Sequence, residues 1–153
     1  MAESKIKGSC HCGGVQYEFT GKPTHMINCH CSICCQTTGA SYGTYFRVPS
    51  SNFTLLKKET LKGYKTSKDS TRMFCGNCGA HVVGGNAEGD VKGSEYDPDG
   101  TWICGGTVRG DPGTASQQGH VFTNYKLPWV KISDGIPSCG EGELFSEMMQ
   151  KKD

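Results

Sequence analysis

The fold that we predict for this chain depends on two short stretches, Cys10-His-Cys12 and Cys75-Gly-Asn-Cys78. Each stretch carries two closely spaced thiols, and the neighbouring glycines let the backbone turn around a metal ion. Two such knuckles, far apart in the sequence, can meet to give tetrahedral coordination by four sulfurs, which suits zinc. We therefore expect a closed zinc site that fastens an N-terminal hairpin to the middle of a sheet.

A third cluster, Cys29-His-Cys31-Ser-Ile-Cys34, places three thiols close enough for one loop to surround a single ion. Three thiolates on Zn²⁺ leave one position for water or a substrate, and their negative charge makes the ion a weak activator of water. A substrate thiol is a better fourth ligand, because zinc would deprotonate it at neutral pH. This cluster predicts a catalytic zinc that acts on thiols.

The residues alone leave alternative ligand sets open. Cys10 and Cys12 can instead pair with two cysteines of the third cluster. A histidine from elsewhere in the chain can also complete the third cluster as a second inert site, and the histidines free to approach are His25, His81 and His120. We expect the remaining cysteines, Cys35, Cys104 and Cys139, to be ordinary thiols.

The composition favours one small zinc-binding domain over residues 1–153. Ten cysteines and 22 glycines accompany a hydrophobic content of only 35% in 153 residues, so a metal clip would support a modest core. A formal charge of +1 without a basic stripe gives no reason to expect nucleic acid.

The sequence shows neither an apolar signal segment nor a membrane span, which predicts a cytoplasmic location. In that reducing compartment, clustered cysteines are metal ligands more often than disulfides. Oligomeric state is not predictable here.

Hydrophobic patterning predicts a mainly β fold of short antiparallel sheets with a short C-terminal helix. Val15, Tyr17 and Phe19 alternate with polar residues, as in a half-buried strand. Further strands are expected at 41–48, 53–56, 61–66, 71–74, 81–83, 102–108, 120–122 and 129–132, with the strand at 102–108 broken at Gly105-Gly106. We expect a loop at 26–36 and another at 84–100, the second mobile or lying over a site. Residues 141–152 carry one apolar helical face, with Leu144, Phe145, Met148 and Met149 packing on the sheet or on another subunit.

Proton transfer would need a further group near the third cluster. On residue type alone, the candidates are His81, His120 and Tyr45.

The sequence resembles the glutathione-dependent formaldehyde-activating enzyme family, which includes centromere protein V-like domains. The resemblance lies in Gly8-Ser-Cys-His-Cys-Gly-Gly-Val-Gln-Tyr17, Cys29-His-Cys-Ser-Ile-Cys34 with Thr38-Gly39, and Arg72-Met-Phe-Cys-Gly-Asn-Cys-Gly79. Looser matches follow at His120-Val-Phe122, Pro128-Trp129 and Ile132-Ser-Asp-Gly-Ile-Pro137. His81 and the segment 84–100 depart from the family pattern, where a substrate pocket could be lined.

The resemblance implies a tent-like β fold with two zincs per chain. It implies that Cys10, Cys12, Cys75 and Cys78 hold a structural zinc, and that Cys29, Cys31 and Cys34 hold a catalytic one. The implied activity is that of a carbon–sulfur lyase of the S-(hydroxymethyl)glutathione synthase type, with glutathione as co-substrate. Two alternatives remain: a related enzyme that acts on a larger metabolite, and a non-catalytic zinc-binding interaction domain.

Overall fold

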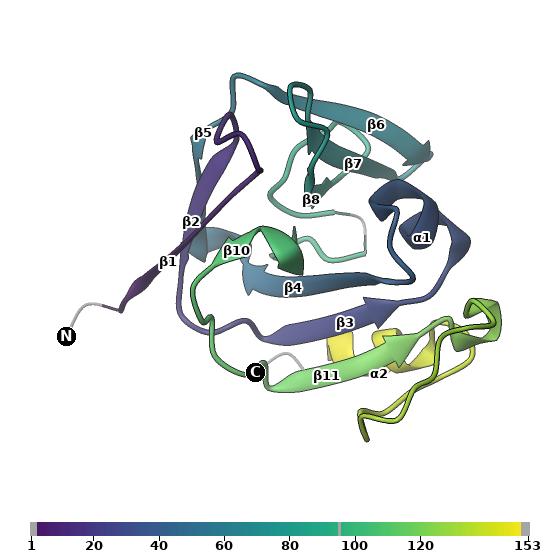
Figure 1. Ribbon diagram of the computed structural model, residues 1–153. Helices are drawn as coiled ribbons and strands as arrows, with labels where there is room; N and C mark the ends of the chain where they lie inside the picture. The colour runs from purple at the N-terminus through teal and green to yellow at the C-terminus, as the bar shows by residue number, and fades with distance from the viewer. Residues whose placement is uncertain (1–2, 95, 151–153) are drawn as a thin grey trace.

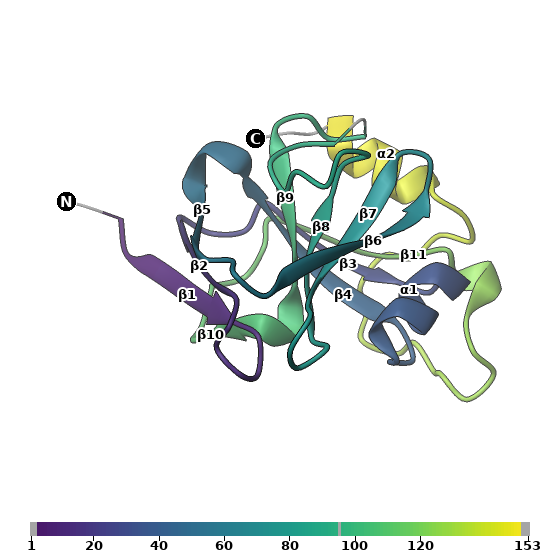
Figure 2. The same cartoon turned by 90° about the horizontal axis from the view of Figure 1, so that it is seen from above.

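The computed structural model describes residues 3–94 and 96–150 and shows two sheets that share a core (Figures 1 and 2). The four-stranded sheet has the order β10-β1-β2-β5. Its strands are β1 (Lys5–Ser9), β2 (Gln16–Thr20), β5 (Phe53–Lys57) and β10 (Val108–Arg109). All its neighbouring strands are antiparallel, as predicted.

The seven-stranded sheet has the order β11-β3-β4-β9-β8-β7-β6. Its strands are β3 (His25–Cys29), β4 (Gly43–Pro49), β6 (Leu61–Ser67), β7 (Ser70–Cys75), β8 (His81–Gly85), β9 (Gly100–Cys104) and β11 (Gln117–Val121). The pair β3–β11 is parallel, with Cys29 opposite Val121. A parallel pair requires a long crossover, which the chain supplies between the two strands.

Two α-helices and three single turns of 3₁₀ helix complete the described structure. The α-helices are α1 (Ser32–Thr38) and α2 (Glu143–Gln150), and the 3₁₀ turns are Ser50–Asn52, Gly105–Thr107 and Thr123–Tyr125. No helix in the described ranges is long and apolar enough to cross a membrane.

The alternation predicted for β2 is present, with Tyr17 and Phe19 fully buried. They join Val48, Val82, Val83, Ile103 and neighbouring side chains in a core between the two sheets. A second cluster is built on Ile27, Tyr45 and Val121 and includes Cys29, Cys34 and Cys104. The three-cysteine cluster therefore lies at the edge of a packed region.

The prediction of a loop at 26–36 is wrong, because β3 extends to Cys29 and α1 begins at Ser32. The helix starts there because the Cys31 sulfur accepts a hydrogen bond from the Cys34 N–H, as an N-cap side chain does. It ends at Gly39, whose left-handed backbone (φ 70°) suits a glycine C-cap.

The prediction of a strand at 129–132 is also wrong. Leu127 and Val130 close a turn through a 3.0 Å backbone hydrogen bond, and the Trp129 side chain is 69% exposed. Pro128 lies inside this turn and has no N–H to offer a sheet ladder.

The predicted C-terminal helix corresponds to α2. Leu144 is partly buried against the second cluster. The side chains of Phe145, Met148 and Met149 lie outside the described part of the structure.

Candidate metal and substrate site

Four cysteines from two distant hairpins form one group, which we call the four-cysteine site. The sulfurs of Cys10, Cys12, Cys75 and Cys78 all lie within 4.8 Å of one another. Cys10 and Cys12 follow β1, whereas Cys75 ends β7 and Cys78 lies in the turn to β8. The site therefore joins the four-stranded sheet to the seven-stranded sheet.

Hydrogen bonds to sulfur favour the thiolate form in the four-cysteine site, whereas burial raises the pKa of Cys10. The Val15 N–H donates to Cys10 Sγ at 3.2 Å, and the Cys78 N–H donates to Cys75 Sγ at 3.4 Å. The Thr60 hydroxyl lies 3.2 Å from Cys75 Sγ, and this contact and the Cys78 N–H lower the pKa of Cys75 to about 6. Metal binding needs thiolates, so these four sulfurs fit a tetrahedral zinc site.

Three further cysteines form a second group, the three-cysteine site. Cys29 ends β3, Cys31 caps α1 and Cys34 lies in its first turn, and their sulfurs also lie within 4.8 Å of one another. No histidine, aspartate or glutamate from residues 3–94 or 96–150 joins this group. In those ranges the protein thus supplies three soft ligands, which suit zinc.

The three thiols have unequal acidities. A hydrogen bond with Cys29, followed by one with Cys34, lowers the pKa of Cys31. The hydrogen bond with Cys31 raises the pKa of Cys29, and burial raises it further. The Cys34 N–H adds a 3.3 Å hydrogen bond to Cys31 Sγ. The hydrogen bonds among the three sulfurs therefore favour a thiolate within this site.

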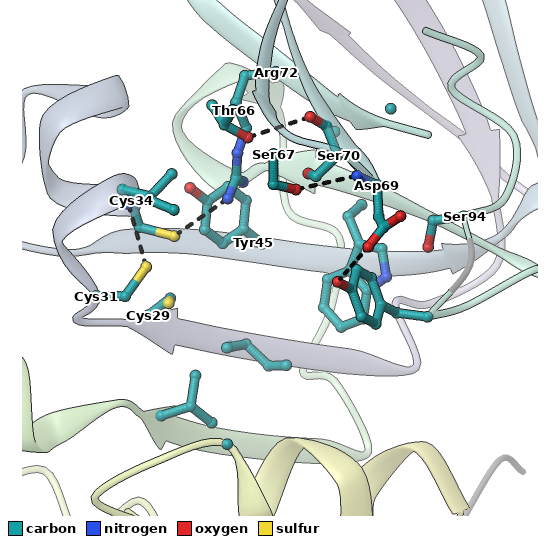
Figure 3. Close-up of a pocket in the computed structure, with 18 of the residues that line it drawn as sticks. Cys29, Cys31, Cys34, Tyr45, Thr66, Ser67, Asp69, Ser70, Arg72 and Ser94 are labelled. Atoms are coloured by element: carbon teal, nitrogen blue, oxygen red, sulfur yellow. Dashed lines mark hydrogen bonds between the residues drawn. The ribbon is translucent and has the colours of Figure 1, made fainter. Parts of the chain in front are cut away.

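A cavity of about 770 Å³ leads away from the three-cysteine site. Figure 3 shows the cysteines on one side of this pocket and Asp69 and Ser94 on the other. Its apolar lining side chains, which we call the apolar wall, are Ile27, Ile33, Val91, Trp102, Val121 and Phe122. Its hydroxyl-bearing lining side chains are Thr66, Ser67, Ser70, Ser94, Tyr96 and Ser146. The space can hold a molecule considerably larger than an aldehyde.

The segment 84–100, predicted to be mobile or to lie over a site, contributes to this cavity through Val91, Ser94 and Tyr96. A buried ion pair holds its far end, because Arg47 Nη2 donates to Asp97 Oδ1 at 2.9 Å. Asp97 also accepts a 3.0 Å hydrogen bond from the Trp102 indole. The wall is thereby tied to β4 and β9.

Arg72 is a charged cavity residue that was not among the site residues predicted from the sequence. It extends from β7, and its Nη2 lies 3.8 Å from Cys34 Sγ (Figure 3). Its Cζ lies 5.8 Å from the centre of the Tyr45 ring. The alternation of β7 was an available signal, because Thr71 and Met73 are buried on one face and Arg72 points to the other. A guanidinium stays charged, so the thiolates have a cation beside them.

Tyr45 is the predicted proton-transfer residue that lines the cavity. It is only 6% exposed, and its hydroxyl has no hydrogen-bond partner among the described residues. Burial raises the pKa of Tyr45, and the neighbouring Cys34 raises it further. The phenol is therefore protonated at neutral pH and is a potential donor.

The two histidine candidates lie outside the cavity lining. His81 packs edge-on to Tyr45 with ring centres 6.3 Å apart, and neither of its nitrogens has a partner in the described structure. Burial and the positive charge of Arg72 lower the pKa of His81 to about 4, so its ring is neutral. His120 is bonded instead to His30 and Asp134.

The other three cysteines belong to neither sulfur group. Cys35 Sγ lies 3.4 Å from the Ser41 carbonyl oxygen, and Cys139 Sγ lies 3.1 Å from that of Glu141. Cys104 is buried, which raises its pKa to about 12. All three are free thiols in the structure.

Comparison with known proteins agrees with this arrangement. The chain is similar in structure to a Rhodobacter sphaeroides protein solved by crystallography, with 19% sequence identity and a TM-score of 0.53. That match covers 87% of this chain and 99% of the other, and it shows a shared fold. The family model for the glutathione-dependent formaldehyde-activating enzyme matches residues 5–124, which include all seven cysteines of the two sites. The chain therefore belongs to the glutathione-dependent formaldehyde-activating enzyme family.

Proposed function

We propose that the protein is a zinc-dependent carbon–sulfur lyase that forms and cleaves the adduct of a thiol with an aldehyde or another small electrophile. Glutathione is the thiol that family membership favours. The observation that carries the proposal is the position of three cysteine sulfurs beside a cavity of about 770 Å³, with no fourth ligand from the described chain. The four-cysteine site, by contrast, is proposed to hold a structural zinc.

The three-cysteine site is suited to a thiol substrate. Zinc held by Cys29, Cys31 and Cys34 would provide a binding position for the substrate sulfur and favour its thiolate form. Arg72 places a positive charge beside Cys34 and offsets part of the negative charge of three thiolates. The apolar wall limits water around the reacting carbon.

Proton movement accompanies both directions of the reaction. In adduct formation the thiol loses its proton, a carbon–sulfur bond forms, and the carbonyl oxygen gains a proton to become a hydroxyl. In cleavage the hydroxyl loses its proton, the carbon–sulfur bond breaks, and the released thiolate gains a proton to become the thiol. The Tyr45 phenol is our first candidate for this transfer, because it is protonated and borders the cavity. His81 and His120 are weaker candidates, because neither side chain lines the cavity.

The size of the cavity favours a second candidate function within the same chemistry. Formaldehyde needs little room beyond its thiol partner, whereas the apolar wall offers contacts to a larger carbon skeleton. An enzyme that acts on the adduct of a larger, partly apolar electrophile would use these contacts.

Substrate choice can be tested with the zinc-loaded protein, glutathione and a series of aldehydes of increasing size, starting with formaldehyde. Adduct formation and cleavage would be followed by NMR exchange spectroscopy. The proposal predicts acceleration over the uncatalysed exchange, and the second candidate predicts a higher kcat/KM for the larger apolar aldehydes. Absence of acceleration with every aldehyde, at full zinc loading, would contradict both and favour a non-catalytic zinc-binding domain.

A further inference from the structure

A chain of three hydrogen-bonded side chains runs from the protein surface to the residue between two cysteines of the three-cysteine site. Asp134 Oδ2 lies 2.8 Å from His120 Nε2, and His120 Nδ1 lies 2.9 Å from His30 Nε2. His30 is fully buried and His120 is 2% exposed, whereas the Asp134 side chain is 45% exposed. His30 directly connects Cys29 to Cys31 in the sequence.

The outer hydrogen bond of this chain, between Asp134 and His120, has a defined direction. The bond with His120 lowers the pKa of Asp134, so its carboxylate is ionised at neutral pH and can only accept. His120 Nε2 must therefore donate to Asp134. His120 Nδ1 and His30 Nε2, 2.9 Å apart, share one hydrogen between them. The two bonds hold the His120 ring between its partners.

Backbone and ring contacts hold the same residues in place. The His30 N–H donates to the Val121 carbonyl at 3.1 Å, and the His120 N–H donates to the Pro137 carbonyl at 2.8 Å. The Tyr42 ring packs on His30 with centres 4.7 Å apart. His30 is therefore held both at its backbone and at its ring, between Cys29 and Cys31 in the chain.

We propose that Asp134, His120 and His30 form a positioning chain that holds the Cys29–Cys31 peptide and thereby sets how tightly the three-cysteine site retains zinc. Residues that orient ligands in this way commonly change metal affinity about 10–100-fold when they are replaced. The inference rests on the proposed function in one respect, that this site holds a metal. Asp134 lies beyond residues 5–124, so the end of the chain falls outside the family match.

Asp111 provides a matched control for Asp134. Both aspartates are exposed, and both accept a hydrogen bond from the N–H two residues ahead: 2.8 Å from Gly113 to Asp111, and 3.0 Å from Ile136 to Asp134. Asp134 differs by its bond to His120. Asp111→Ala thus removes a comparable turn contact and leaves the positioning chain intact.

The experiment measures zinc release from the fully loaded protein into excess chelator, with a colorimetric zinc reporter. We expect two phases in the unaltered protein and assign the faster one to the three-cysteine site through its absence in Cys31→Ser. Asp134→Ala should accelerate this phase about 10-fold and leave the slow phase unchanged, whereas Asp111→Ala should change neither. A merely structural effect of Asp134 would lower Tm without a selective change in the fast phase.

His120→Phe removes both bonds at similar volume and should accelerate the fast phase at least as much as Asp134→Ala. Equal release kinetics for Asp134→Ala and Asp111→Ala would overturn the inference. If the release kinetics are equal and adduct turnover persists, the role of the positioning chain is refuted and the proposed function stands. Binding of only one zinc by the unaltered protein, lost in Cys75→Ser and kept in Cys31→Ser, would overturn both.

Discussion

The two cysteine sites use the same ligand chemistry in different surroundings. The four-cysteine site joins two sheets and draws its ligands from two distant hairpins. The three-cysteine site draws its ligands from the continuous segment 29–34, and the large cavity lies beside it. In the first site the chain supplies a full tetrahedral set, and in the second it supplies three ligands and a charged neighbour, Arg72.

We propose that this difference separates a structural role for the first site from a chemical role for the second. A metal that joins distant segments contributes its binding free energy to folding. A metal bound within one short segment closes little chain, so the fold depends on it less. Matched substitutions in the two sites, or in two similar side chains, can test this difference.

The largest effect is expected for Cys75→Ser. It removes a buried ligand from the four-cysteine site, and structural zinc sites contribute about 10–16 kcal/mol, comparable with the whole stability of a domain. We expect loss of one zinc and unfolding, measured by metal analysis and circular dichroism. Cys139→Ser, which changes a thiol outside both sites, serves as the control. A stable Cys75→Ser protein with unchanged zinc content would refute the assignment.

Cys31→Ser applies the same change to the three-cysteine site. Here we expect loss of one zinc and of adduct turnover, with the cooperative thermal transition retained. The helix cap weakens but does not vanish, because serine is itself a good N-cap residue. Turnover that survives with this zinc absent would show that the three-cysteine site is not catalytic.

Two buried tyrosines, Tyr17 and Tyr45, differ in the hydrogen bonding of their hydroxyl groups. The Tyr17 hydroxyl lies 2.8 Å from Thr107 Oγ1, whereas the Tyr45 hydroxyl has no partner in the described structure. Tyr17→Phe should cost about 1 kcal/mol of unfolding free energy and leave kcat unchanged. Tyr45→Phe should cost little stability and lower kcat about 100-fold. Urea unfolding and steady-state kinetics on both variants test this, and unchanged kcat in Tyr45→Phe would remove Tyr45 from the mechanism.

The smallest effect concerns pH and His81. Its pKa is lowered to about 4 in the folded protein, against about 6.5 in an unfolded chain. The unfolded state therefore takes up the proton first, so this contribution to stability is complete above pH 6.5 and is lost as the pH falls toward 4. We expect His81→Leu to reduce the loss of unfolding free energy between pH 7 and pH 5 by about 1–2 kcal/mol. Identical pH profiles for both proteins, at equal zinc content, would contradict the shift.

Local chemistry made much of the fold and site predictable. Thiols at knuckle spacing indicated metal binding without any tertiary information, and the structure groups their sulfurs as 10–12–75–78 and 29–31–34. The alternation around Tyr17 gave the strand β2, because one face of that strand is buried. Both signals come from residues that lie close together in the sequence.

Other features depended on contacts that a local pattern does not contain. Helix α1 has the sequence Ser-Ile-Cys-Cys-Gln-Thr-Thr, a poor helix former, and Cys31 caps it. The His30–His120 bond joins residues 90 positions apart. Trp129 and Val130 resembled a strand by composition, yet the turn at Pro128 decided their conformation.

The central claim, that only the three-cysteine site accepts a substrate thiol, is tested most directly by zinc X-ray absorption spectroscopy with and without glutathione. We expect seven sulfurs for the two zincs of the free protein, since the two sites hold seven cysteines. We expect eight with saturating glutathione, and no increase in Cys31→Ser. An unchanged sulfur number at saturating glutathione would contradict thiol binding at this site.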